Sequence, residues 1–224
     1  MKIGVIAAMD IEYRKLQAVL NGAVEGQLAG NDIVLWQCGM GKVNAAVGAM
    51  QLIHKHHPDC IISTGLAGGI DNSLRVMDVV VGSEVAYHDV WCGEGNEVGQ
   101  VQGLPTRFPT HPRLLECALS VDGYEQLHVL KGLICTGDQF ITDRTAQAAI
   151  KDKFPSALAC DMESAAIAHT CYLLNKPFIS VRMISDTPGN TENHQQQWSD
   201  FLAAMGDHSF RFVQQFLSQL PNQL

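Results

Sequence analysis

The sequence predicts an α/β fold with three layers, in which a mainly parallel or mixed central sheet lies between two layers of helices. Short apolar runs typical of buried strands alternate along the chain with longer segments of helical periodicity. The chain has no internal repeat, no low-complexity segment and no linker long enough to separate two domains. Its 224 residues are 46% hydrophobic and 17% charged, which is sufficient for a sizeable core. We therefore expect a single αβα domain over residues 1–224.

The predicted elements follow one another from end to end. The apolar runs predict strands at Lys2–Ala8, Val34–Cys38, Cys60–Ser63, Asp78–Ala86, Leu133–Thr136, Ala157–Cys160 and Phe178–Ile184. Helices are predicted at Ile11–Leu20, Val43–His54, Ala146–Phe154, Ser164–Leu174 and Phe201–Leu217. The stretch His88–Pro112 is rich in Gly and Pro and lacks periodicity. We expect it to be a long irregular loop, and such loops often have a function.

Composition and charge exclude several classes of partner. A formal net charge of −8 argues against binding to nucleic acid or to an anionic membrane, since both require concentrated Lys and Arg. Seven cysteines with no Cys-x-x-Cys pair suit a reducing compartment. The first apolar run is short and is followed at once by Asp10 and Glu12, so it is predicted to be a strand rather than a signal peptide. We expect a cytoplasmic protein.

Two carboxylates follow predicted strands near the end of the chain. Glu163 comes after Ala157–Cys160, and Asp186 comes after Phe178–Ile184. The helix predicted between these strands makes a parallel crossover unit, so both acids should lie at the carboxyl edge of one sheet. Ligands usually bind there in open α/β proteins. Arg182 lies inside the second of these strands and must be paired if it is buried; Glu163 is the expected partner if the two strands are adjacent.

Other polar or glycine-rich segments also follow predicted strands. Each has a structural explanation of its own: Glu12 suits the first turn of a helix, Glu163 a helix cap and Asp186 an Asx turn. Their joint occurrence at the ends of strands nevertheless predicts a site. The segments are Met9–Glu12, Gly65–Gly69, Asp138–Ile141, Met162–Glu163 and Ser185–Asp186.

Two features that invite a cofactor have simpler interpretations. His54, His56 and His57 lie at a predicted helix end, where cations are favoured, and no Cys or carboxylate stands at ligand spacing. Gly41-Lys42 is followed by Val43 rather than Ser or Thr, so the segment is no Walker loop. We expect neither a metal nor a cofactor.

The ordered motifs of the chain resemble the 5'-methylthioadenosine/S-adenosylhomocysteine nucleosidases, within the nucleoside phosphorylase fold superfamily. The resemblance runs from Met1 to about Phe216 and implies a nucleoside phosphorylase-like fold, a small nucleoside substrate and a homodimer. Its motifs are Lys2-Ile3-Gly4-Val5-Ile6 with Ala8-Met9 and Glu12, Gly39-Met40-Gly41-Lys42-Val43, Thr64-Gly65 with Ala67-Gly68-Gly69, Tyr87-His88-Asp89, Gly137-Asp138 with Phe140-Ile141, Met162-Glu163 with Ala165, and Val181-Arg182 with Ile184-Ser185-Asp186.

The resemblance implies two catalytic residues. Asp186 would donate a proton to N7 of adenine, and Glu12 would orient and deprotonate the attacking water. This assignment makes chemical sense, because breaking an N-ribosyl bond develops negative charge on the base and positive charge on the sugar. A protonated acid cancels the first charge, while a carboxylate on the other face of the sugar activates water.

The resemblance also implies a set of substrate-binding residues. Glu163 would accept both ribose hydroxyls, with Arg182 holding Glu163 and Met162 packing against the sugar. Phe140 would stack on adenine. The remaining members are Ile141, whose backbone would read the polar edge of the base, Ser185, which would support Asp186, Met9, Met40 and Trp198, which would line the alkylthio pocket, and Ala67, Gly68 and Asp161.

The chain departs from the family pattern in three places. Leu66 stands where the family commonly has Ser, Asp161 stands where its familiar bacterial members have Glu, and the segment His88–Pro105 matches poorly. Three alternative functions stay open: a phosphate-dependent purine nucleoside phosphorylase, a nucleosidase for aminodeoxyfutalosine, and a non-catalytic nucleoside-binding module. A phosphorylase needs a cationic cradle for phosphate, and neither Met9–Glu12 nor Gly65–Gly69 contains Lys or Arg.

Overall fold

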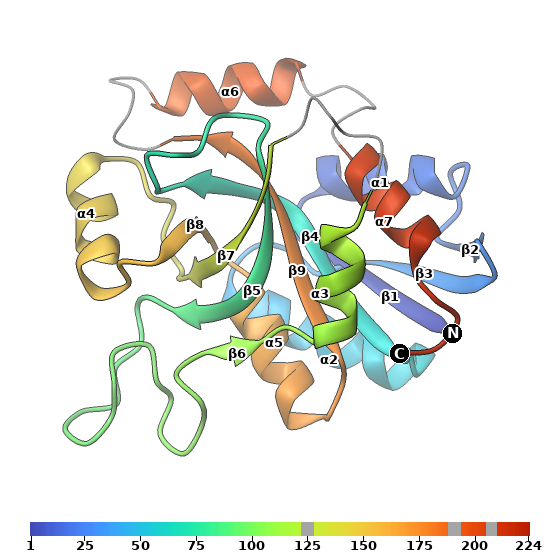
Figure 1. The fold of residues 1–224 in the computed structure, drawn as a ribbon, viewed down its shortest axis with the longest axis horizontal. Coiled ribbons are helices and arrows are strands. Elements are labelled where there is room, and N and C mark those ends of the chain that lie inside the picture. The colour runs from blue at the N-terminus through green and yellow to red at the C-terminus, as the bar shows by residue number, and fades with distance from the viewer. Residues whose placement is uncertain (122–127, 188–193, 205–209) are drawn as a thin grey trace.

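The computed structural model describes residues 1–121, 128–187, 194–204 and 210–224. It confirms the predicted α/β class, with a mixed central sheet covered by helices on both faces (Figure 1). The strands are β1 (Lys2–Ala7), β2 (Glu25–Leu28), β3 (Asn31–Gln37), β4 (Cys60–Gly69), β5 (Val79–Tyr87), β6 (Phe108–Pro109), β7 (Val129–Thr136), β8 (Ala157–Asp161) and β9 (Phe178–Asp186). The helices are α1 (Asp10–Val19), α2 (Lys42–His56), α3 (Pro112–Leu119), α4 (Arg144–Lys153), α5 (Ser164–Leu173), α6 (His194–Ala204) and α7 (Arg211–Gln219).

Five strands of the sheet, β4 among them, form a closed circuit. Its order is β2-β3-β1-β4-β8-β7-β5-β6, and β9 pairs with both β4 and β5. The pairs β4–β8, β8–β7, β7–β5, β5–β9 and β9–β4 therefore form a closed circuit of strands. The pairings of β4 with β8 and of β5 with β9 are antiparallel, whereas the other three are parallel.

This topology corrects the predicted crossover between β8 and β9. The two strands are not neighbours in one parallel sheet, because β8 pairs with β4 and β7 whereas β9 pairs with β4 and β5. Their ends nevertheless converge. Near the end of β4, Gly68 lies opposite Cys160 of β8 and opposite Asp186 of β9. The predicted meeting of the two acidic strand ends is thus correct, although its predicted cause is wrong.

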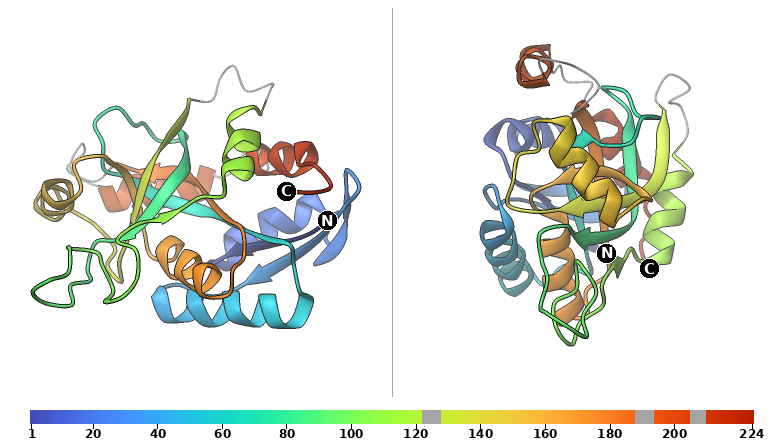
Figure 2. Two further views of the ribbon diagram at one scale, coloured as in Figure 1. Left: turned by 60° about the horizontal axis from the view of Figure 1, so that its bottom comes forward. Right: turned by 90° about the vertical axis from the view of Figure 1, so that its left-hand side faces the viewer.

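Helices pack on both faces of the sheet and divide the core between them. Helices α2 and α5 lie side by side on one face, and α3 and α7 lie on the other (Figure 2). One cluster of buried apolar residues joins α2 and α5 to their face of the sheet, and a second joins α1, α3 and α7 to the other face. A smaller cluster packs α4 against β7 and β8. The two termini lie close together, with the N-terminal ammonium donating to the Asn222 carbonyl at 3.3 Å.

Some element boundaries differ from those predicted. Strand β4 continues to Gly69, through the glycine-rich segment that was predicted to follow a shorter strand ending at Ser63. The single helix expected at Phe201–Leu217 is two helices, α6 ending at Ala204 and α7 beginning at Arg211. Strands β2 and β6 and helix α3 were not predicted, because all three are short. Between β5 and α3 the stretch is irregular apart from β6, as predicted.

The histidine cluster marks the end of α2, as expected. His54 and His56 lie in the last turn, and His57 takes a left-handed conformation with φ of 50° that ends the helix. None of the helices in the described part of the chain combines the length and the apolar character of a membrane span.

Gly48 lets α2 approach the end of β3 closely. A Cβ atom at this position would lie 2.3 Å from Cys38 Cβ and 3.0 Å from Cys38 Cα. No side chain larger than hydrogen fits at that distance without a movement of the backbone. The contact helps set the spacing between α2 and the sheet, and thus the position of the turn that precedes the helix.

Replacing Gly48 with Ala is therefore expected to destabilise the protein. In an ordinary helix interior Ala is better than Gly by about 1 kcal/mol, but overpacking of a core typically costs about 1–3 kcal/mol. The measurement is the midpoint of thermal unfolding. Gly26→Ala is the control, because its Cβ would meet Leu20 at an ordinary 3.4 Å. A Gly48→Ala variant as stable as the wild-type protein would show that the packing argument is wrong.

Candidate active site

One cavity at the carboxyl end of β4 collects the predicted site residues. Its volume, including the space open to solvent at its mouth, is about 610 Å³. Every predicted site residue except Arg182 lines it: Met9, Glu12, Met40, Ala67, Gly68, Phe140, Ile141, Asp161, Met162, Glu163, Ser185, Asp186 and Trp198. Four further residues complete the lining: Ala8, Leu66, Gln139 and Cys160. Gln139 and Leu66 belong to segments already predicted to contribute, whereas Ala8 and Cys160 looked like strand interior.

Glu12 is held by backbone groups in the floor of the cavity. Its Oε1 accepts the N–H of Leu66 at 2.8 Å, and its Oε2 accepts those of Met9 at 2.9 Å and Ala8 at 3.2 Å. The bond from Met9 also caps α1, so the predicted role of Glu12 in the first turn of a helix is confirmed. The bond from Leu66 has no such role, because it joins α1 to a distant strand.

The environment of Glu12 raises the pKa of its carboxyl group. The residue is 3% exposed, and burial is the main cause of the increase. The N–H groups that bind the carboxylate and the nearby charge of Arg182 lower the pKa and offset part of this effect. Gly65 makes the close approach of β4 possible, since a Cβ there would lie 2.6 Å from Glu12 Oε1.

Asp186 lies at the end of β9, on the opposite side of β4 from β1. It is 1% exposed, and Ser185 Oγ donates to its Oδ1 at 2.6 Å. The same hydroxyl lies 3.3 Å from the carbonyl oxygen of Ala67 on β4. Ser185 therefore fixes the orientation of the Asp186 carboxyl group toward the cavity.

Glu163 faces the turn before α2 rather than its own helix. Its side chain makes no capping hydrogen bond to α5, which excludes the helix-cap explanation, and its Oε1 accepts the N–H of Gly41 at 2.9 Å. Burial and the neighbouring Asp161 raise its pKa from 4.5 to about 7, while Arg182 and the Gly41 N–H act in the opposite direction.

Arg182 pairs with Asp161 and not with Glu163, which corrects the sequence-based expectation. Its Nε donates to Asp161 Oδ2 at 2.6 Å, and its Nη2 donates to Ser63 Oγ at 2.9 Å. Asp161 also accepts hydrogen bonds from the hydroxyls of Thr136, at 2.6 Å, and Ser164. Strands β8 and β9 do not pair with each other, and β4 is the neighbour that they share. Across β4, Arg182 reaches Asp161, the last residue of β8, and lies behind the cavity wall.

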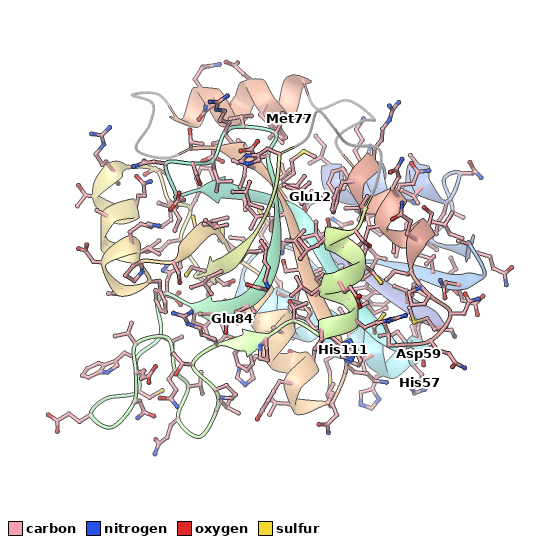
Figure 3. All side chains as sticks on the ribbon, viewed as in Figure 1. Glu12, His57, Asp59, Met77, Glu84 and His111 are labelled. Carbon is pink, nitrogen blue, oxygen red and sulfur yellow. The ribbon has the colours of Figure 1, made fainter. Side chains whose placement is uncertain are left out.

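Aromatic and apolar side chains form the outer wall of the cavity. Phe140 is 49% exposed, and its ring lies against that of Trp198 from α6, with the ring centroids 5.6 Å apart. Met9 and Met40 extend this wall. Figure 3 shows Glu12 on the side of the molecule toward α6, with His57 and Asp59 at the opposite end of the sheet.

The acidic residues of the cavity bind other protein groups. In the described ranges, no group of three or more His, Cys, Asp or Glu side chains is placed to hold one. The acidic residues bind backbone N–H groups, hydroxyls and one guanidinium instead. The arrangement therefore offers proton transfer and hydrogen bonding to a polar ligand.

Comparison with known proteins identifies the family. The sequence model described as the phosphorylase superfamily matches residues 2–218. A 5'-methylthioadenosine/S-adenosylhomocysteine nucleosidase from Bacillus thuringiensis subsp. konkukian is 39% identical, over 98% of this chain and 100% of its own length. The chain belongs to this nucleosidase family. A relative of the same name from Chromohalobacter salexigens is also 39% identical, over 98% of this chain and 97% of its own.

Solved structures of the nucleosidase family share the fold over the whole chain. The enzyme from Colwellia psychrerythraea, in complex with adenine, superposes with a TM-score of 0.91 at 35% identity, covering 100% of this chain and 97% of its own. The Neisseria meningitidis enzyme, in complex with methylthio-immucillin-A, gives 0.90 at 36% identity, covering 98% and 99%. A futalosine hydrolase of Helicobacter pylori, at 23% identity and a TM-score of 0.88, shares the fold.

The raised pKa of Glu163 predicts how stability depends on pH. The folded protein keeps this proton up to about pH 7, whereas the unfolded chain releases it near 4.5. Folding therefore takes up a proton between these values, and the free energy of unfolding contributed by this group falls as pH rises through them. Glu163→Gln should gain stability relative to wild type by roughly 3 kcal/mol between pH 4 and pH 9. Denaturant unfolding at several pH values measures this difference.

The control for this experiment is Glu94→Gln, which changes an exposed carboxylate on the loop after β5. This variant controls for the loss of one carboxylate outside the cavity. A difference in unfolding free energy between Glu163→Gln and wild type that does not change with pH would contradict the electrostatic account of the site.

Proposed function

We propose that this protein hydrolyses the N-ribosyl bond of 5'-methylthioadenosine, S-adenosylhomocysteine or both, releasing adenine and the 5'-thio-ribose. The observation that carries the proposal is the meeting of Glu12 and Asp186, from opposite ends of the sequence, in one largely apolar cavity beside Glu163. Membership of the nucleosidase family supports it.

In the proposed mechanism Asp186 is the general acid. A proton delivered to N7 of adenine lets the base leave as a neutral molecule, so negative charge does not accumulate in the cavity. Ser185 orients the carboxyl group through its hydrogen bond. Because Asp186 is buried, bulk water does not compete with adenine for this proton.

Glu12 is the proposed general base on the other side of the sugar. Its three backbone N–H donors fix the carboxylate in one orientation, which suits it to position a water molecule for attack on the anomeric carbon. Burial raises its pKa, which makes it a stronger base than an exposed carboxylate. The charge of Arg182 and the N–H groups counteract that increase and favour the ionised form.

The other residues of the cavity are assigned to substrate binding. Glu163 accepts the two ribose hydroxyls, and Met162 packs on the sugar. Phe140 stacks on adenine, and its exposed ring face and its contact with Trp198 support that role. The 5'-alkylthio group fits the apolar wall formed by Met9, Met40 and Trp198.

A phosphate-dependent phosphorylase is the less favoured alternative. Among the described residues that line the cavity there is no Lys or Arg to hold phosphate. Arg182 lies behind the wall and binds Asp161, and the carboxylate of Glu12 would repel an anion. Aminodeoxyfutalosine stays an alternative substrate.

Substituting the two proposed catalytic acids tests the mechanism. Asp186→Asn and Glu12→Gln should each lower kcat for adenine release by about 10²–10⁴-fold, the usual contribution of a general acid or base. The assay measures the release of adenine in the presence and in the absence of phosphate. The substrate is methylthioadenosine, adenosylhomocysteine or aminodeoxyfutalosine. Strict dependence on phosphate would favour the phosphorylase, and an Asp186→Asn variant with wild-type turnover would show that the acid is misassigned.

We also propose that residues 1–224 form one catalytic domain located in the cytoplasm. The match of the superfamily model to residues 2–218 supports a single domain. All seven cysteines are free thiols, as suits a reducing compartment.

A homodimer is proposed through the exposed face of α2. Val43, Val47 and Met50 lie one helical turn apart and are 74%, 51% and 43% exposed. Such an apolar stripe on a surface helix is typical of an interface, and it continues from Met40 at the cavity.

Val47→Glu should therefore convert the protein to a monomer in light scattering after gel filtration, because it places a charge in the centre of the stripe. Gln214→Glu adds the same charge at an exposed position of α7, on the other face of the sheet, and should leave a dimer. A monomeric wild-type protein would overturn the proposal.

A further inference from the structure

We propose that Lys42, Asp89 and Asp138 form a positioning clip that holds two walls of the nucleoside site against each other. One wall is the turn at Gly39–Lys42, and the other is the segment Asp138–Ile141. The clip lies outside the cavity lining and acts through these two segments. This inference rests on the proposed function and extends it to residues that do not touch the substrate.

The three side chains close a small circuit of hydrogen bonds. Lys42 Nζ lies 2.8 Å from Asp89 Oδ1 and 2.7 Å from Oδ2. Asp89 Oδ2 accepts the N–H of Asp138 at 2.9 Å, and Asp138 Oδ1 accepts the N–H of Lys42 at 2.8 Å. Lys42 Nζ also lies 3.8 Å from Asp138 Oδ2. The circuit joins the start of α2 to the segments that follow β5 and β7.

Each of the two walls places one functional group within two residues of the clip. Gly41, directly before Lys42, donates its N–H to Glu163 Oε1 at 2.9 Å. Phe140 follows Asp138 by two residues and faces the cavity. The bond from the Lys42 N–H to Asp138 therefore sets the separation between the ribose side and the adenine side of the site.

Glycines allow the segments to come this close. Gly41 has φ of +88°, and a Cβ there would lie 3.1 Å from Asp138 Oδ1. At Gly137 a Cβ would lie 2.3 Å from His88 Cε1 and 3.0 Å from Asp89 Cγ. The contacts thus depend on the backbone path as well as on the three charges.

The side chains of the clip are too accessible to stabilise the fold strongly. Burial raises the pKa of Asp89, yet the bonds from Lys42 and the Asp138 N–H outweigh it and hold the pKa below its usual range. The Lys42 and Asp89 side chains are 23% and 22% exposed, and that of Asp138 is 48% exposed. Ion pairs this accessible contribute little to stability. Loss of the clip should therefore affect nucleoside binding more than folding.

The test compares kcat and KM for methylthioadenosine in paired variants. Lys42→Met and Asp138→Ala should raise KM about tenfold, as expected for the loss of one good hydrogen bond, and change kcat less than about threefold. Lys42→Arg and Asp138→Asn should stay near wild type, because Arg keeps the charge and the amide oxygen of Asn still accepts the Lys42 N–H.

Lys151→Met is the matched control. Lys151 binds Asp71 with similar accessibility, 26% and 30%, and also donates to the carbonyls of Pro155 and Ala157, so it connects neither of the two walls of the site. It should lower the unfolding temperature and leave KM unchanged. Clip variants with wild-type KM, or with a KM that rises equally in the conservative pair, would overturn the proposal.

A second measurement separates this inference from the proposed function. If the wild-type protein releases no adenine, the nucleosidase proposal fails, and the clip is then judged by calorimetric affinity for methylthioadenosine. Lys42→Met should bind it about tenfold more weakly than wild type, whereas Lys42→Arg should not. Equal affinities, or no binding by the wild-type protein, would overturn the clip as well.

Discussion

The site depends on the ion pair between the buried guanidinium of Arg182 and the carboxylate of Asp161. Arg182 is 2% exposed and donates to Asp161, and its charge also lowers the pKa values of Glu12 and Glu163. Carboxylates gathered in an apolar cavity without a cation would take up protons instead of ionising. A buried ion pair adds little net stability, although removing one partner costs about 3–5 kcal/mol. The Arg182–Asp161 pair therefore determines which acids carry charge. The free-energy cost of removing this pair from water is offset by other interactions of the fold.

The path of β4 explains how so many polar groups reach one point. Gly65 allows the strand to pass against Glu12, and Gly68 lies opposite the ends of both β8 and β9. Asp161, the last residue of β8, is fixed from three sides by Arg182, Thr136 and the hydroxyl of Ser164. Fixing this residue also fixes the turn that places Glu163 beside Gly41. The pairing of the strands thus brings their ends together, and the polar contacts at these ends fix the side chains of the site.

Most of this arrangement could be predicted from the sequence, because apolar runs locate strands and the residues after a strand lie at its end. That reasoning collected Glu12, Glu163 and Asp186 correctly. It failed for the partner of Arg182, because pairing order decides which strand ends touch and an apolar pattern carries no such information. It also predicted one helix where the structure has α6 and α7, because the apolar periodicity runs on through both of them. The contacts of the clip were not predicted, because an apolar pattern does not show that Lys42, Asp89 and Asp138 meet.

Glu12 and Glu163 differ in what determines their charge. The protein itself supplies the donors that pin Glu12, whatever occupies the cavity. Glu163 accepts one N–H, and its pKa of about 7 leaves it partly protonated at neutral pH. In the proposed complex, ribose hydroxyls that donate to this carboxylate would stabilise its charged form and lower its pKa, so nucleoside binding would release a proton. The full negative charge of the site would then develop only once the sugar is in place, where it would stabilise the oxocarbenium-like transition state.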